Sequence, residues 1–123
     1  MDPYRVIVAD DLEDVRTIIR MTLERAGGFE IVGEAEDAEK ASLLAQELNV
    51  DVVTLDLHMP GMEHLEGARL VKQRAPGARV VLVTGTYHPA YDPDLDIPEI
   101  DLHVEKSEVM ANLADQLRTL LRG

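Results

Sequence analysis

The decisive stretch of this sequence is VVTLDLHMPG, Val52–Gly61. Its first half is apolar and rich in β-branched residues, which predicts a strand buried on both faces of a sheet. Asp56 stands near the end of that strand, where an isolated carboxylate is costly to bury. Met59–Gly61 then breaks the pattern with residues that are typical of a turn. Packing alone therefore does not explain Asp56.

Strands and helices alternate along the chain on both sides of this stretch. The expected strands cover Tyr4–Ala9, Phe29–Ala35, Val50–Leu57, Arg79–Thr84 and Leu102–Val104. The expected helices cover Glu13–Ala26, Ala38–Leu48, Leu65–Arg74 and a last helix that Ser107 is predicted to cap, with Val109, Leu113, Leu117 and Leu120 on one face. This alternation is typical of the α/β class, with a single doubly wound sheet of parallel strands covered by helices on both faces.

One connection breaks the alternation. Residues 87–100, YHPAYDPDLDIPEI, lie where the pattern calls for a fourth helix. The prolines at 89, 93 and 98 leave little room for more than one or two helical turns. The sequence therefore predicts an irregular segment in place of the fourth helix.

Composition limits the class of protein. The chain has 123 residues, of which 46% are apolar and 3% aromatic, so we expect one domain over residues 1–123 with an aliphatic core. A net charge of −12 makes nucleic acid an unfavourable partner, because phosphate backbones repel it. No apolar run reaches the ~20 residues of a membrane span and no signal peptide is visible, so we expect no membrane contact and a cytoplasmic location. The absence of cysteine excludes disulfides and thiolate metal sites.

Polar side chains fall at the ends of the predicted strands. The first strand is followed by Asp10 and Asp11, the third ends at Asp56, the fourth ends at Thr84 and the fifth is followed by Lys106. In an open parallel sheet these ends share one edge, where ligands bind. Carboxylates gathered there repel one another unless a cation joins them, and oxygen ligands alone favour a hard cation such as Mg²⁺.

Such a site can accept a phosphoryl group. Beside a metal ion and the Lys106 ammonium, Asp56 can act as a nucleophile toward phosphorus. Lys106 and the metal would stabilise charge on the phosphoryl oxygens, and the Thr84 hydroxyl would donate a hydrogen bond to one of them. Asp56 would then stand at the strand tip in order to be chemically modified.

The motifs VIVADD, TLDLHMPGM, VVLVTG and VEKS occur in this order, each at a predicted strand end. Through these motifs, the chain resembles the receiver domain of two-component response regulators over nearly its whole length. The resemblance implies a flavodoxin-like (βα)5 fold. It also implies a phosphoacceptor switch, which takes a phosphoryl group from the phosphohistidine of a sensor histidine kinase and then changes partner or dimer binding. Such a domain is not an enzyme that turns over a substrate.

The resemblance assigns a role to each matching residue. Asp56 becomes the phosphoacceptor and Lys106 the charge partner of the phosphorylated carboxylate, while Thr84 becomes the switch hydroxyl. The implied Mg²⁺ ligands are Asp11 directly, Asp10 through water, Asp56, and the backbone carbonyl of His58.

Two departures from the family pattern concern output rather than phosphorylation, and a further one concerns the residue after Lys106. His103 occupies the position where receiver domains usually carry Tyr or Phe as a switch ring, and an imidazole can take up a proton near neutrality. We therefore expect an altered switch with some pH sensitivity. The proline-rich 87–98 segment replaces the fourth helix, so the homodimer through the fourth-helix, fifth-strand and fifth-helix face cannot be assumed. Ser107 replaces a proline that often follows the lysine, so a cis bond is not carried over.

Other interpretations remain open at the sequence level. Asp10 and Asp11 also suit the cap and first turn of the next helix, and Asp56 also suits a hydrogen-bonded structural carboxylate. A receiver-fold interaction module that works without phosphorylation is the alternative function. A haloacid-dehalogenase-like phosphatase is disfavoured, because it would need a second Asp where this chain has His58.

Overall fold

Parallel strands form the central layer of the molecule. The computed structural model describes residues 2–57, 59, 65–85 and 93–122. Its strands are β1 (Tyr4–Ala9), β2 (Phe29–Ala35), β3 (Val52–Asp56), β4 (Arg79–Thr84) and β5 (Leu102–Glu105). They form one five-stranded sheet in the order β2-β1-β3-β4-β5, and every neighbouring pair is parallel. The order steps outward from β1 in both directions, as the predicted doubly wound sheet requires.

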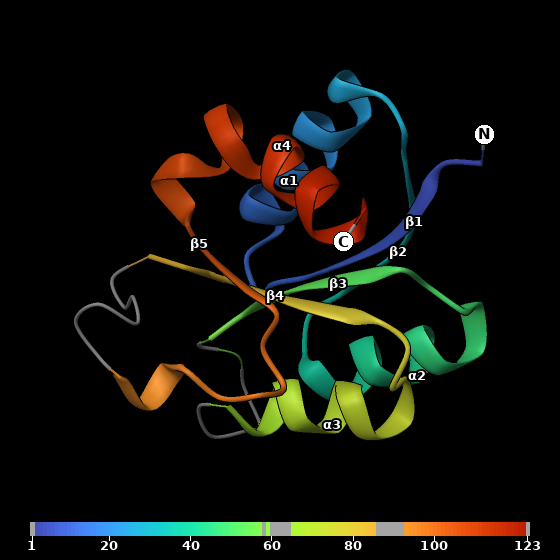
Figure 1. The fold of residues 1–123 in the computed structure, drawn as a ribbon, viewed down its shortest axis with the longest axis vertical. Coiled ribbons are helices and arrows are strands. Elements are labelled where there is room, and N and C mark those ends of the chain that lie inside the picture. Colours follow the sequence, from blue (N-terminus) through green and yellow to red (C-terminus); the bar gives the residue numbers. More distant parts are fainter. Residues whose placement is uncertain (1, 58, 60–64, 86–92, 123) are drawn as a thin grey trace.

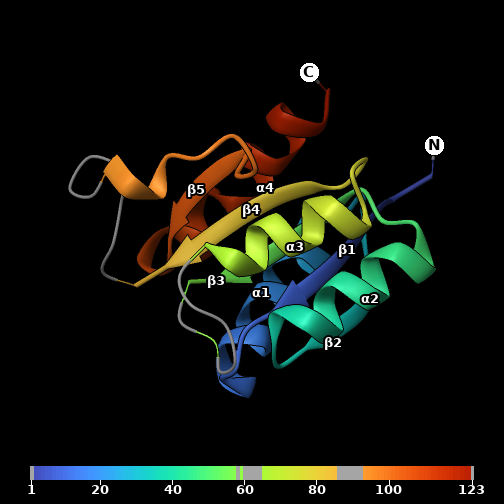
Figure 2. The same ribbon diagram turned by 90° about the horizontal axis from the view of Figure 1, so that it is seen from below.

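Helices cover both faces of this sheet (Figure 1). The helices are α1 (Glu13–Ala26), α2 (Ala38–Leu48), α3 (Glu66–Arg74) and α4 (Val109–Arg122). α1 and α4 lie on one face, and α2 and α3 lie on the other, where Figure 2 shows them running beside each other. The alternation of strand side chains produces two apolar cores, one under each helix pair. In β1, Val6 and Val8 pack toward α1 and α4, whereas Ile7 and Ala9 pack toward α2 and α3.

The burial of β3 explains its sequence. All five of its residues are buried, because β1 and β4 flank it and helices cover both of its faces. Val53 and Leu55 belong to the core under α2 and α3, and Val52 belongs to the core under α1 and α4. A strand without a solvent-facing side favours a continuous apolar run over alternation. Asp56 therefore occupies the last position of the most enclosed kind of strand.

Most element bounds agree with the sequence predictions to within one residue, and two predictions differ by more. β3 begins at Val52 rather than Val50, because Asp51 is exposed and its carboxylate accepts a hydrogen bond from the Arg5 amide at 2.8 Å. The prediction that Ser107 caps the last helix is wrong. Ser107 lies inside a short 3-10 helix, η2 (Lys106–Glu108), and α4 starts directly after it.

The connection between β4 and β5 is irregular, as predicted, over its described part. Residues 93–101 contain one 3-10 turn, η1 (Pro93–Leu95), and no α-helix; residues 86–92 lie outside the described residues. Leu95 and Ile100 are buried against the core under α2 and α3. Asp101 fixes the end of the connection, because its amide donates to the Val80 carbonyl at 2.8 Å and its carboxylate lies 2.8 Å from Lys72 Nζ.

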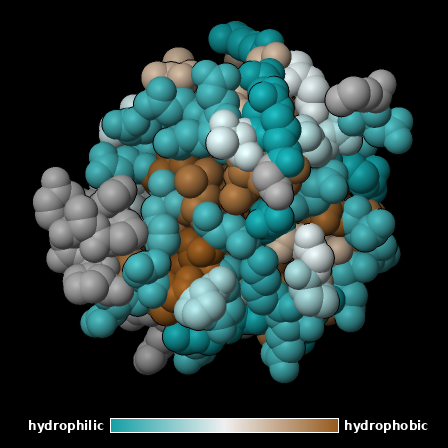
Figure 3. Space-filling view, in the orientation of Figure 1, coloured by the Kyte–Doolittle hydropathy of each residue, from teal (hydrophilic) through white to brown (hydrophobic). Residues whose placement is uncertain are grey.

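Figure 3 shows how little apolar surface is exposed on this side of the molecule. Hydrophobic residues reach the surface mainly in the middle of the view, over β5 and the chain that leads into it, and hydrophilic residues dominate around them. Among the described residues, no helix combines the length and the apolar character that crossing a membrane requires.

Candidate functional site

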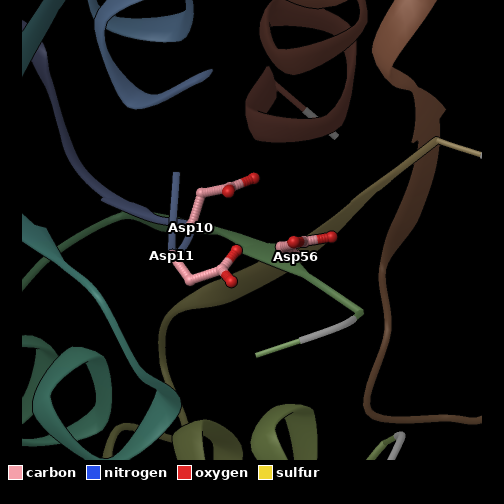
Figure 4. A group of neighbouring side chains, drawn as sticks. All are labelled: Asp10, Asp11 and Asp56. Carbon is pink, nitrogen blue, oxygen red and sulfur yellow. The ribbon is translucent and has the colours of Figure 1, made fainter. Parts of the chain in front are cut away.

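Three aspartates meet at the carboxyl edge of the two central strands. Asp10 and Asp11 directly follow β1, and Asp56 ends β3. β1 and β3 are neighbours in register, with Ala9 opposite Leu55, so the residues that follow them are also close. Each carboxylate offers an oxygen that lies within 4.8 Å of the others. Figure 4 shows the three side chains converging on one small region.

The three carboxylates differ in burial. Asp10 is 1% exposed and Asp56 is 6% exposed, whereas Asp11 is exposed to solvent. The site therefore has a buried floor and an open side at Asp11. Two buried carboxylates side by side are costly unless positive charge or hydrogen bonds compensate them.

Lys106 supplies positive charge to both buried carboxylates. Its Nζ lies 3.3 Å from Asp10 Oδ2 and 3.5 Å from Asp56 Oδ2. The lysine follows β5, two strands away from β3 in the sheet, and its long side chain reaches back over the end of β4. The prediction that this lysine joins the carboxylates at one edge is confirmed by these distances.

Main-chain contacts hold Asp10 in place. Its Oδ1 accepts a hydrogen bond from the Leu12 amide at 2.9 Å, and its own amide donates to the Ala35 carbonyl at 3.1 Å. Its backbone carbonyl accepts from Arg16 Nη1 at 2.6 Å. Its Oδ2 is buried and faces the Lys106 ammonium, which lies 3.3 Å away. That oxygen, beside the other carboxylates, is an available ligand atom.

The pKa of Asp10 is raised above its ordinary value of 3.8. Burial is the largest cause, because it disfavours the charged form, and the Asp56 carboxylate acts in the same direction. The hydrogen bond from Leu12 and the charge of Lys106 oppose these effects without cancelling them. A further cation would complete the compensation.

The donor set fits a hard divalent cation. Three carboxylates within reach of one point, one of them with an oxygen buried beside Lys106, supply only the oxygen ligands that Mg²⁺ prefers. The open side at Asp11 leaves room for the water molecules that Mg²⁺ usually keeps. His58, the fourth expected ligand through its backbone carbonyl, lies outside the described residues.

The structure places the two expected switch residues differently. Thr84 ends β4 at the same edge as the carboxylates, is 3% exposed and pairs in register with Glu105. His103 pairs with Leu82, further down the sheet, and lies outside the carboxylate cluster. Its Nε2 lies 2.7 Å from the Leu95 carbonyl oxygen, which only accepts, so this nitrogen is the donor. The ring is thereby joined to η1.

The sequence analysis missed Arg16. Its side chain contacts the Asp10 carbonyl and lies 3.3 Å from Glu34 Oε1 through Nε. In the sequence it is one charged residue among several on a predicted amphipathic helix. It follows Asp11 by five residues, and no motif in the sequence marks its contact with the site.

Comparisons with known proteins agree on one family. The family model described as response regulator receiver domain matches residues 6–118. Response regulator GacA of Pseudomonas viridiflava is 41% identical over 119 residues, which cover 97% of this chain and 56% of that protein. Protein-glutamate methylesterase/protein-glutamine glutaminase 2 of Anaeromyxobacter dehalogenans is 32% identical over 118 residues, which cover 96% of this chain and 34% of that protein.

A solved structure gives the same result. The signal receiver domain of the response regulator NarL from Mycobacterium tuberculosis matches with a TM-score of 0.88 and 26% sequence identity. The match covers 100% of this chain and 99% of that domain. By contrast, this chain spans only about a third to a half of the length of the two curated relatives. The shared part is therefore the receiver unit of longer proteins.

Proposed function

Because this chain belongs to the response regulator receiver domains, we propose that it accepts its phosphoryl group on Asp56. A receiver domain is a phosphoacceptor signalling switch, and the flavodoxin-like parallel sheet is the fold of that family. The observation that carries the choice of Asp56 is its position at the end of the central strand β3, beside the Lys106 ammonium and the carboxylates of Asp10 and Asp11. We infer that residues 1–123 act as one such domain.

Each residue of the site has a proposed part in the transfer. A carboxylate oxygen of Asp56 attacks the phosphorus of a phosphohistidine, the new P–O bond forms as the P–N bond breaks, and the histidine imidazole leaves with the electron pair. Lys106 stabilises negative charge on the phosphoryl oxygens. The Thr84 hydroxyl donates a hydrogen bond to one of these oxygens and so senses that Asp56 is modified.

A divalent ion completes the proposal. The carboxylates of Asp10, Asp11 and Asp56, with the His58 carbonyl as a predicted further ligand, would hold Mg²⁺. When bound, Mg²⁺ supplies the positive charge that three transferring oxygens need beyond what Lys106 gives. The buried carboxylate of Asp10 supports this assignment, because its pKa stays raised although Lys106 lies 3.3 Å from its Oδ2.

The proposed phosphoryl donor is a sensor histidine kinase, and the proposed location is the cytoplasm. We propose no substrate turnover by this chain beyond gain and loss of its own phosphoryl group, although one relative carries a methylesterase name. A homodimer through the fourth-helix, fifth-strand and fifth-helix face stays a prediction. The described residues contain two parts of that face, β5 and the helix after it, which is labelled α4 here and corresponds to the fifth helix of the family. The short helix η1 lies where the family has its fourth helix.

Phosphorylation with a small donor tests the proposal. The protein is incubated with Mg²⁺ and acetyl phosphate, and its intact mass is measured. We expect a gain of one phosphoryl group that requires Mg²⁺ and is absent in Asp56→Asn. Asp14→Asn, an exposed aspartate in the first turn of α1, is the matched control and should gain the group normally. A gain in Asp56→Asn equal to that of the wild type would contradict the assignment.

A further inference from the structure

Arg16 is a charged side chain enclosed next to the site. It lies in the first turns of α1, and its side chain is 14% exposed. Nη1 donates to the Asp10 carbonyl oxygen at 2.6 Å, and Nε lies 3.3 Å from Glu34 Oε1. A guanidinium can serve two partners at once because its donors are arranged in a rigid plane. Arg16 thus joins the turn after β1 to the end of β2.

Both main-chain groups of Asp10 are fixed to β2 as a result. The Asp10 amide donates directly to the Ala35 carbonyl at 3.1 Å. The Asp10 carbonyl is held by Arg16, which is itself held by Glu34, the residue before Ala35. The peptide planes before and after Asp10 therefore each have a hydrogen-bond partner, Ala35 for the first and Arg16 for the second.

Asp11 depends on this arrangement more than its neighbours do. Its side chain is exposed, and the hydrogen bonds and ion pairs of the site's described residues include none to its carboxylate. The position of Asp11 therefore follows from the backbone on either side of it. Before it, Arg16 holds the Asp10 carbonyl oxygen, and after it the Leu12 amide donates to Asp10 Oδ1.

We propose that Arg16 is a positioning residue for the metal site, acting through the Asp10 carbonyl to hold Asp11 where it can reach the cation. The inference rests on the proposed function, since it presupposes that the three aspartates bind Mg²⁺. Groups that orient metal ligands from outside the coordination sphere are worth about 10-fold to 100-fold in metal affinity.

The sign of the effect separates this role from a general electrostatic one. Arg16 is a positive charge near a cation site, so Coulomb repulsion alone predicts that removing it strengthens Mg²⁺ binding. A positioning role predicts the opposite, a weaker Mg²⁺ affinity in spite of the lost repulsion. A purely structural role changes the unfolding temperature and leaves the affinity of the folded protein unchanged.

Arg20 provides a matched control on the same helix. It contacts the same glutamate, with Nη1 2.9 Å from Glu34 Oε2, and it lies one turn further along α1. The structure gives Arg20 no contact with Asp10 among the described residues. Arg16→Met and Arg20→Met therefore remove equal charge and one Glu34 partner each, and only the first releases the Asp10 carbonyl.

The test is an NMR titration of the full chain with Mg²⁺ alone, following amide signals, for wild type, Arg16→Met, Arg16→Lys and Arg20→Met. Circular dichroism checks that each variant is folded. We expect the Mg²⁺ dissociation constant to rise about 10-fold or more in Arg16→Met. Arg20→Met should stay within about twofold of wild type. Arg16→Lys keeps the charge but loses the planar fork, so it should show a smaller loss.

The outcomes are distinguishable. Wild-type affinity in folded Arg16→Met, or an equal loss in Arg20→Met, overturns the positioning role and leaves the proposed function intact. If Arg16→Met does not fold, Arg16→Lys decides: weaker binding supports the role and unchanged binding overturns it. No Mg²⁺ binding by the wild type overturns the proposed metal site and this inference with it.

Discussion

Burial in this fold makes the ionised form of Asp10 less favourable than it is in water. Its folded-state pKa lies above 3.8, chiefly because it is buried, so the folded state holds the proton more tightly than the unfolded chain does. By linkage, the contribution of Asp10 to stability is most favourable below pH 3.8 and is lost as the pH rises through the raised pKa. At neutral pH without a metal ion, Asp10 therefore lowers the free energy of unfolding.

Replacement of Asp10 by Asn exposes this cost. Asn keeps an oxygen that can accept from the Leu12 amide and removes the charge. We compare the unfolding temperatures of Asp10→Asn and wild type in metal-free buffer. The unfolding temperature of the variant minus that of wild type should rise by a few degrees in all between about pH 3.5 and about pH 7. Thermal unfolding at a series of pH values measures it. A difference that is constant or falls with pH would contradict the assigned cause.

Added Mg²⁺ serves as the control for the same variant. An ion that binds only the folded state raises the unfolding temperature with its concentration. Mg²⁺ should raise the unfolding temperature of wild type more than that of Asp10→Asn. The difference in unfolding temperature between the two proteins therefore narrows or reverses. Equal gains would show that Asp10 does not contribute to the metal site.

At the scale of elements, α2 and α3 approach each other closely at Gly67. A Cβ placed on Gly67 of α3 would lie 2.8 Å from the Ala38 Cβ of α2, which is closer than two such atoms approach. Ala38 cannot move aside without its helix, because its Cβ is bonded to the backbone. A side chain at position 67 would therefore force a shift between these two helices, which lie side by side in Figure 2.

Gly67→Ala should accordingly destabilise the protein although alanine favours helices. We expect the free energy of unfolding to fall by about 1–3 kcal/mol, as for other overpacked cores, measured by urea denaturation. Gly77→Ala is the control, because a Cβ added there would have no neighbour within 4 Å and its φ is not positive. If both substitutions had the same small effect, the close helix contact would not limit position 67.

A second prediction at this scale concerns β5 and η1, which His103 joins through the Leu95 carbonyl. His103→Phe supplies the ring that the family usually carries and removes the donor. We expect a loss of about 1 kcal/mol from the unpaired carbonyl and faster hydrogen exchange at the Ile100 and Asp101 amides, which lie in the same connection. The expected pH sensitivity of His103 stays a prediction.

His103→Gln is the control for this substitution, because its amide keeps a donor. Hydrogen exchange at Ile100 and Asp101 should be closer to wild type in this variant than in His103→Phe. Equal protection in all three proteins would mean that the contact between His103 and η1 does not hold the connection.

Elements can be predicted from the sequence where burial and punctuation agree. Glu13–Ala26 begins after an acidic pair and ends at Gly27, whose φ of 80° suits glycine, and the structure has the same bounds. The predicted start of β3 is misplaced because Val50 is buried without being in a strand. The prediction of a Ser107 cap is wrong because a serine before an apolar stripe looks the same in the sequence whether it caps an α-helix or lies inside a 3-10 turn, as it does here.

For the molecule as a whole, the site can be predicted because the topology gathers strand ends. Parallel strands place Asp10, Asp56 and Lys106 at one edge whatever the loops do, so position in the sequence is sufficient. Arg16 cannot be predicted in this way. Its partner is a backbone carbonyl, which every residue has, so no residue pattern marks the contact.

The order of the elements along the chain also determines when the site gains its positive charge. Chains are synthesised from the N-terminus, and a growing chain that has reached α3 already contains Asp10, Asp11 and Asp56. Lys106 is added only after β5, the strand at the open edge of the sheet. Until then the two buried carboxylates lack their ammonium partner. During synthesis, the last strand to be made thus completes the five-stranded sheet and is followed directly by the lysine that contacts both buried carboxylates.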